Sequence, residues 1–302
     1  MKKLSLYFGI LLLSGLLILG CDKPAPTELV QDQNQLQVQV IAKDTQDEFY
    51  SNGFDTTGVV SDLSKLQNVI TVTGAKITYQ NFTAKASLAQ TIFFDMKMPV
   101  HTQHGRIVGY RTVTPGTVKF NGITAKQIPL RVMFRDHGSF GDSLLGDRYV
   151  LYSGRNNNVN PFNYTAGSFV GYFFKPDSMG RAVSFNIRTP AEINANVKIK
   201  GSRKNNNLEA TLEWDNSSAD PVEIILGAWV RNSNLAFPLY RIKPKDNGRV
   251  KLPASLLNSI PQDKFDKFIF TFIRRNEGTQ PFLNDRLHIK SQTIHTIIVD
   301  IP

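Results

Sequence analysis

The heptapeptide LEATLEW, residues 208–214, decides the fold class because its polarity alternates at every position. Leucine, alanine, leucine and tryptophan occupy the even-numbered positions, while glutamate and threonine occupy the odd-numbered ones. An extended chain with this period of two has one apolar and one polar face, whereas a helix needs an apolar residue at about every third or fourth position. We therefore predict a half-buried strand of an antiparallel sheet over residues 208–214.

Extended segments of similar character follow one another along most of the chain. The segments 222–230 and 268–273 are apolar on both faces, which predicts central and more deeply buried strands. Further strands are expected over residues 36–40, 70–79, 91–96, 107–113, 117–121, 128–134, 149–152, 169–174, 183–187, 197–199 and 294–301. Helical signals are confined to two short segments, 61–68 and 254–260. The sequence therefore predicts an all-β protein.

The expected strands divide into two sets near Pro190. We predict an N-terminal β-rich domain over 35–190 and a C-terminal domain over 191–302, both mostly antiparallel and sandwich-like. In the second set, strands and turns are followed by a short helical turn after Pro253 and then by further strands. This order is similar to the crossover of immunoglobulin-like and fibronectin-like sandwiches. The resemblance implies a fold but carries no function.

The N-terminus carries a targeting pattern. Lys2 and Lys3 precede an apolar run, 4–19, which ends at Gly20 and at Cys21, the sole cysteine of the chain. A membrane-spanning helix takes about 20 apolar residues, whereas the core of a signal peptide takes about 7 to 15, and the run is nearer the second length. The sequence Ile-Leu-Gly-Cys at this point resembles the lipobox of bacterial lipoproteins. The resemblance implies that residues 1–20 are removed as a signal peptide and that the thiol of Cys21 is acylated.

An uncleaved membrane helix and an ordinary secretory signal peptide are the alternatives to a lipobox. Under the secretory alternative, the exported chain would carry an unpaired and reactive thiol at Cys21. Acylation of the thiol removes this difficulty and so favours the lipobox. Residues 21–34 are polar and offer little to bury, so we expect them to form a tether behind the lipid. The resemblance thus predicts a protein of the bacterial cell envelope, held on the outer membrane by its lipid, although Asp22 resembles an enterobacterial signal for inner-membrane retention.

The charge balance argues against a nucleic-acid partner. The chain has a net charge of +10, and without Lys2 and Lys3 it keeps 33 basic and 25 acidic residues, a net charge of +8. A nucleic-acid-binding protein concentrates its basic residues on one face among stacking aromatic side chains. Here the excess is spread evenly along the chain, so no nucleic acid is expected to bind.

One tetrapeptide suggests catalysis. Residues 141–144, Gly-Asp-Ser-Leu, are identical to the nucleophile block of GDSL-type esterases, and Asp285 and His288 reproduce the Asp-x-x-His spacing of that family. The resemblance implies Ser143 as the nucleophile, His288 as the base and Asp285 as the residue that orients the base. That family places its serine near the mature N-terminus and before a long helix, whereas Ser143 precedes a strand-like segment. We therefore expect no enzyme and keep the serine esterase as an alternative.

Two weaker patterns concern metal ions. Asp136, Asp142 and Asp147 would offer carboxylate oxygens to a calcium ion, but their spacing does not match an EF-hand loop, and surface turns explain them equally well. His101 and His104 would share one face of a helix, yet neighbouring proline and glycine predict a hairpin loop without a third ligand. We expect no cofactor and no bound metal, with the three aspartates as the only calcium candidates.

Aromatic residues offer the remaining binding signal. Phe162 and Tyr164 lie in an asparagine-rich stretch and are candidates for a carbohydrate platform, whereas both tryptophans fall on strands with core patterning. The sequence as a whole predicts an envelope lipoprotein with a non-catalytic binding, adhesive or structural role. An envelope protein or a glycan is the expected partner besides the membrane, and a carbohydrate-binding module is the alternative function.

Overall fold

The computed structural model describes residues 37–40, 49–51, 68–136, 139–153, 162–216, 220–232, 236–245, 247–261, 263–282 and 285–302. Within these ranges the chain is almost entirely β-strand, and the only helix is the short α2 (Ala254–Asn258). The predicted all-β, mostly antiparallel and sandwich-like fold class is confirmed. None of the described helices is long and apolar enough to cross a bilayer. The predicted signal peptide, Cys21, the tether and residues 61–67 of the expected helix lie outside the described residues.

An eleven-stranded sheet, here called the main sheet, runs through the described chain. Its strands in spatial order are β1 (Gln37–Val40), β15 (Ala236–Lys243), β14 (Val222–Val230), β17 (Phe265–Phe282), β18 (Asp285–Asp300), β3 (Val69–Tyr79), β4 (Phe82–His101), β9 (Ser139–Ser153), β8 (Lys126–Asp136) and β2 (Phe49–Ser51), with β5 (Ile107–Val113) paired to β4. The strands β17 and β18 form a long antiparallel hairpin, and β18 pairs in parallel with β3. Strands from both ends of the sequence thus meet in the middle of one sheet.

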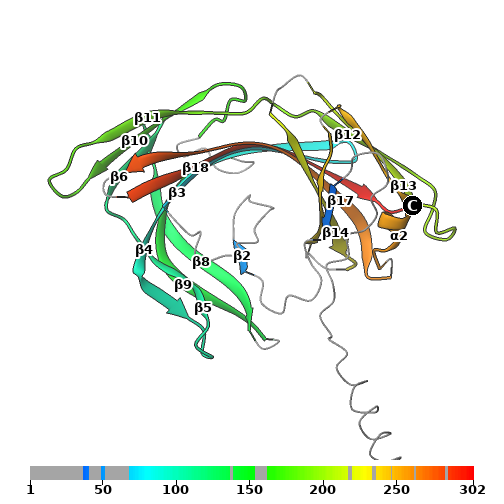
Figure 1. The fold of residues 1–302 in the computed structure, drawn as a ribbon, viewed down its shortest axis with the longest axis horizontal. Coiled ribbons are helices and arrows are strands. Elements are labelled where there is room, and N and C mark those ends of the chain that lie inside the picture. The colour runs from blue at the N-terminus through cyan, green and yellow to red at the C-terminus, as the bar shows by residue number, and fades with distance from the viewer. Residues whose placement is uncertain are drawn as a thin grey trace, which may run out of the picture. The chain divides into compact units, whose positions relative to one another are not determined.

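Two smaller sheets lie against one face of the main sheet. The first has the order β12 (Ala195–Lys200), β13 (Glu209–Trp214) and β16 (Arg249–Leu252), and the second has the order β11 (Val183–Arg188), β10 (Phe169–Pro176), β6 (Gly116–Phe120) and β7 (Ile123–Thr124). Figure 1 shows β17, β18 and β3 side by side between β10 and β11 at one end and β12 and β13 at the other. Leu287 and Ile297 of β18 pack into the two different cores, and both are odd-numbered, so the cores occupy the same face.

Each small sheet encloses its own hydrophobic core. Core 1 lies beneath β12, β13 and β16 and includes Leu208, Leu212, Trp214, Phe268, Phe270 and Phe272. Core 2 lies beneath β6, β10 and β11 and includes Phe93, Phe120, Tyr149, Tyr172, Phe174 and Phe282. In core 2 the ring of Phe93 lies 5.2 Å from that of Phe282 and 5.4 Å from that of Phe174, centroid to centroid. The alternation predicted over 208–214 appears as alternate burial along β13.

The expected boundary near Pro190 coincides with the change from one core to the other. The fully buried members of core 1 all follow residue 190, whereas core 2 combines earlier residues with Phe282 and Leu287. The two segments nevertheless share the main sheet and belong to one compact unit, Gln31–Pro302. The reason is the length of β17 and β18, which continue from core 1 into core 2. Two cores under one sheet are therefore what the structure shows, and a division into two domains stays a prediction.

Several strands are longer than the sequence predicts. The segment 136–142 was expected to form turns, but β9 already begins at Ser139 and pairs closely with β8. Polar residues such as Asp142 and Ser143 resemble a turn in sequence, but Asp142 is exposed on the surface of a two-stranded ribbon and Ser143 is half-buried there. Likewise β17 continues past residue 273 to Phe282, because β18 supplies a hydrogen-bonding partner for its polar end.

Replacing Phe174 with alanine should destabilise the fold strongly. The side chain is fully buried in core 2 and touches the rings of Phe93 and Phe282, so its removal leaves a cavity. We expect a loss of about 3–5 kcal/mol in the free energy of unfolding, measured by urea denaturation. Phe169 on the same strand is 63% exposed and provides the matched control, since Phe169→Ala should change stability by less than about 0.5 kcal/mol. Equal losses in the two variants would contradict the assignment of core 2.

Candidate functional site

Buried polar residues separate the two cores on the covered face of the main sheet. Along β18 the side chains between the two cores on this face are Ser291, Thr293 and His295, and all three are buried. Arg274 of β17, which is fully buried, lies directly beside Thr293. These four residues are called the polar seam. A buried polar group needs a hydrogen-bonding partner, so the seam must be matched by polar groups of the chain that crosses it.

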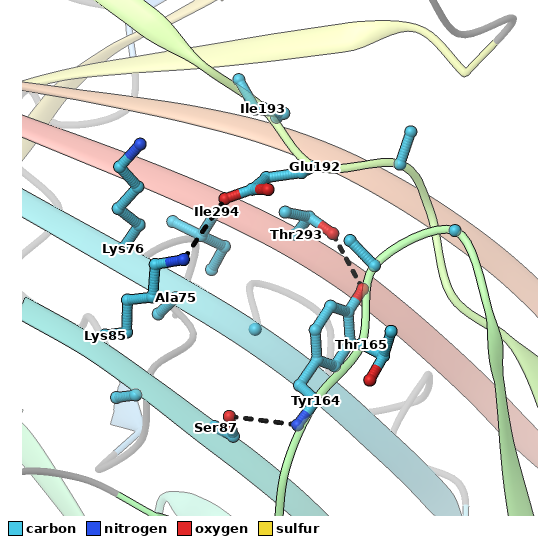
Figure 2. Close-up of a pocket in the computed structure, with 15 residues that line it drawn as sticks. Ala75, Lys76, Lys85, Ser87, Tyr164, Thr165, Glu192, Ile193, Thr293 and Ile294 are labelled. Carbon is cyan, nitrogen blue, oxygen red and sulfur yellow. Dashed lines mark hydrogen bonds and ion pairs between the residues drawn. The ribbon is translucent and has the colours of Figure 1, made fainter.

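A pocket of about 440 Å³ opens over the seam, and it is called the seam pocket (Figure 2). Its floor is made by β3, β4 and β18, where Gly74 and Ser87 lie side by side on neighbouring strands. Its walls are the segment 164–167, which precedes β10, and the segment 191–193, which leads from β11 to β12. The absence of a side chain at Gly74 makes room for the ring of Tyr164 in the wall. The volume falls within the range of about 300 to 1,000 Å³ that is typical of small-molecule sites.

Tyr164 forms one wall because Gly74 allows its ring to lie against β3. A Cβ atom at residue 74 would come within 2.2 Å of Tyr164 Cδ1, so a larger residue has no room there. The backbone N–H of Tyr164 donates to Ser87 Oγ over 3.2 Å, and its hydroxyl lies 2.8 Å from Thr293 Oγ1. Burial raises the pKa of Tyr164 to about 12, so the phenol is neutral at physiological pH.

The direction of these hydroxyl hydrogen bonds follows from the neighbouring carbonyl group. Thr293 Oγ1 donates its proton to the carbonyl oxygen of Pro190 over 3.2 Å. The hydrogen bond between Tyr164 and Thr293 must then be donated by Tyr164, because a hydroxyl has only one proton. The phenol oxygen of Tyr164 keeps its lone pairs as acceptors. The phenol proton is therefore committed to Thr293, and the side chains of Ser291 and Thr189 also lie close to the phenol oxygen.

Further hydrogen bonds fix the two wall segments to each other and to the sheet. Thr189 Oγ1 accepts from the N–H of Ser168 and bonds the carbonyl oxygen of Thr165 over 2.7 Å. Arg274 Nη1 donates to the carbonyl oxygen of Glu192 over 2.7 Å and contacts the carboxylate of Asp215 at 3.2 Å, while its Nη2 donates to the carbonyl of Asp215. Buried charge-assisted contacts of this kind hold a backbone firmly. The pocket is therefore preformed.

Three charged side chains line the seam pocket. Lys76 and Lys85 extend from the neighbouring strands β3 and β4, and Glu192 is the single acidic residue of the lining. Lys85 Nζ lies 3.7 Å from Glu192 Oε1, and Lys76 Nζ donates to Asn194 Oδ1 over 3.1 Å. Figure 2 shows the Lys85 ammonium directed at Glu192 and Lys76 above it. The lining thus carries one more positive than negative charge.

His295 of the polar seam is held as a neutral ring. Its Nδ1 accepts the backbone N–H of Ala195 over 3.0 Å, which requires that Nδ1 carry no proton. The proton therefore resides on Nε2, which donates to Thr78 Oγ1 over 3.0 Å. Burial, together with the nearby charge of Lys76, lowers the pKa of His295 to about 4. His295 thus links the crossing segment to β3 without carrying charge.

The residues of the expected esterase triad are not brought together. Ser143 lies within β9, and His288 lies within β18, with β3 and β4 between the two strands in the main sheet. Asp285 begins β18, and its side chain lies outside what the structure describes. Ser143 is embedded in a strand and pairs with Val132, so it does not occupy the strand-to-helix turn of that family.

The three calcium candidates are also spread out. Asp136, Asp142 and Asp147 occupy different levels of the β8–β9 hairpin, where they pair with Ser139, Met133 and Pro129 respectively. Asp142 forms an ion pair with Arg131, and the side chain of Asp136 lies outside the described residues. Among the described residues no group of three acidic, histidine or cysteine side chains is close enough to hold a metal ion.

The two aromatic residues predicted as a carbohydrate platform lie in different environments. Phe162 is fully buried in core 2, so its prediction as an exposed platform is wrong. Tyr164 does line the seam pocket. The sequence did not predict the floor of the seam pocket or its charged lining. One signal was present, because an isolated glycine within a strand pattern, here Gly74, indicates close approach by another group.

Comparisons with protein families, with curated proteins and with solved structures found no match to this chain. The immunoglobulin-like character expected for residues 191–302 therefore stays a prediction. The seam pocket has to be interpreted from its own residues.

Replacing Gly74 with alanine should disturb the pocket. The new methyl group would clash with the Tyr164 ring, which must move and give up its hydrogen bond to Thr293. We expect a loss of about 1–3 kcal/mol in the free energy of unfolding by urea denaturation. Gly278 on β17 is the matched control, because an added Cβ meets nothing within 4 Å there. A Gly74→Ala variant as stable as Gly278→Ala would show that the ring does not occupy this position.

Stability should fall in acid as His295 takes up a proton. The unfolded chain binds that proton below a pH of about 6.5, whereas the folded chain binds it only near pH 4. The stabilisation is therefore complete above pH 6.5 and declines as the pH falls towards 4, by on the order of 2 kcal/mol after partial solvent screening. The measurement is the urea midpoint as a function of pH. A His295→Asn variant can still accept from Ala195 but cannot titrate, so its curve should be flatter over this window, and a curve of the same slope would refute the assignment.

Proposed function

We propose that this protein is a lipid-anchored component of the bacterial cell envelope with a non-catalytic binding role, and that the seam pocket is its binding site. The observation that carries the binding role is the pocket itself. It is open to solvent, it has the volume of a small-molecule site, and its walls are fixed by Tyr164, Thr189 and Arg274. Preformed polar walls favour binding because little ordering is needed when a ligand enters.

The chemistry of the lining supports binding rather than catalysis. The lining contains no histidine and no cysteine, and both nitrogens of the nearby His295 are engaged in hydrogen bonds. Ser87 accepts a backbone N–H and has no adjacent base among the residues of the lining. Nucleophilic catalysis needs a base within hydrogen-bonding distance of the nucleophile. The lining therefore supplies contacts for a ligand without the pair of groups that acyl transfer requires.

The lipobox-like N-terminus supports the envelope location. A basic start, an apolar run of signal-peptide length and a sole cysteine are the features that a lipoprotein signal combines. Several acyl chains on Cys21 would give a stable membrane anchor, whereas one chain binds only reversibly. The polar residues 22–34 would then hold the binding unit away from the lipid surface.

Substituting Cys21 with serine should abolish lipidation. In bacterial cells supplied with an alkyne-labelled fatty acid, the natural chain should take up label and fractionate with membranes, because the thiol is the acylated atom. The Cys21→Ser chain should take up no label. Ser14→Ala, within the apolar run, leaves the cysteine intact and is the matched control. Label on the Cys21→Ser chain, or none on the natural chain, would refute the proposed anchor.

A further inference from the structure

We infer that the ligand of the seam pocket is a sugar carrying a carboxylate group, such as a uronic acid residue. The inference rests on the proposed binding role and names the ligand class. Its three arguments are the charge of the lining, the pattern of hydrogen-bond acceptors and donors, and the size of the pocket.

The charge of the lining favours an anionic group. Lys76 and Lys85 supply two ammonium groups from adjacent strands, against the single carboxylate of Glu192. The contact of Lys85 with Glu192 spans 3.7 Å between side chains that are 73% and 49% exposed, so it is loose and well screened. An ammonium carries three donors, and Lys76 uses one on Asn194. Both lysines therefore keep donors for a carboxylate held between the two strands.

The hydrogen-bonding groups of the lining also suit the hydroxyls of a sugar. The phenol oxygen of Tyr164 is an acceptor, because its own proton goes to Thr293. The carboxylate of Glu192 is a second acceptor, and Ser87 has a hydroxyl proton to donate, since its oxygen receives the N–H of Tyr164. Vicinal hydroxyls each donate and accept, so they can satisfy this mixed lining, whereas an apolar ligand would leave it unpaired.

The position and size of the pocket agree with a sugar residue. About 440 Å³ is enough for one or two rings, and the exposed Lys85 and Glu192 mark an open mouth through which a longer chain can continue. A single residue of an acidic polysaccharide or a free uronic acid would present the same chemistry.

The test compares methyl glucuronide with methyl glucoside, which differ only in the carboxylate. Binding to the full lipidated protein in detergent micelles is followed by saturation-transfer NMR and titration calorimetry. We expect the glucuronide to bind at least about tenfold more tightly than the glucoside, with a preference that shrinks at high salt. Lys76→Gln and Lys85→Gln should each weaken glucuronide binding by about tenfold and should weaken glucoside binding much less, because the glucoside has no carboxylate to lose.

A matched control distinguishes the pocket from general surface charge. Lys198 is an exposed strand lysine paired with Glu213 at 2.8 Å, and it lies on β12 outside the lining. Lys198→Gln should leave the binding of both sugars unchanged. A loss as large as that of Lys85→Gln would overturn the inference, because the attraction would then come from the surface as a whole.

The failure of the ligand class is distinguishable from the failure of the binding role. Thr165→Trp adds a large side chain to the wall of the pocket and keeps the backbone carbonyl to which Thr189 donates, and circular dichroism is used to check that the variant is folded. If both sugars bind equally, the lysine variants have no effect and Thr165→Trp abolishes binding, the acidic class is wrong and the binding role stands. If Thr165→Trp leaves sugar binding intact, both are wrong. If neither sugar binds at about 10 mM, the acidic-sugar class is wrong. Phosphate and glutamate are then titrated in place of the sugars. Binding that Thr165→Trp abolishes supports the binding role, and no binding of either overturns it.

Discussion

The parallel pairing of β18 with β3 is the interaction on which the rest of the structure depends. It joins the C-terminal hairpin β17–β18 to the N-terminal hairpin β3–β4, and it brings together residues as distant as Thr78 and His295, which are 217 positions apart. Without these backbone hydrogen bonds each hairpin would expose a long edge. With them, one sheet is wide enough to support two cores on the same face.

The polar seam follows from that arrangement. Neither small sheet covers the strip between the cores, and the segments that lead from core 2 to core 1 have to cross it. Their carbonyl groups at Pro190 and Glu192 need donors, and the strands beneath provide them through Thr293 and Arg274. Polar residues inside otherwise apolar strands thus have a structural origin. The same strip contains small residues and lysines at its edge, and this combination creates the pocket.

Local patterns predicted the strands well and the site poorly. The alternating segment 208–214 and the apolar segment 222–230 correspond to β13 and β14. They were predictable because the burial pattern of a strand shows directly in the polarity of its consecutive residues. The polar end of β17, by contrast, is a strand only because β18 pairs with it, and no periodicity within 274–282 reveals that. The seam pocket depends on register between strands that are far apart in sequence, so Gly74 could not be matched with Tyr164 or Thr293 from the sequence alone.

The place of β18 in the sheet also bears on how the chain reaches its final state. The central strand β18 cannot be inserted until residues 285–300 have been synthesised, and parallel pairing over a long separation is a slow step in folding. Until β17 and β18 have been synthesised, β3 has only β4 beside it, and both cores lack the side chains of these two strands. The order of the strands therefore keeps the chain from completing its fold until both the first and the last hairpin of the main sheet are present.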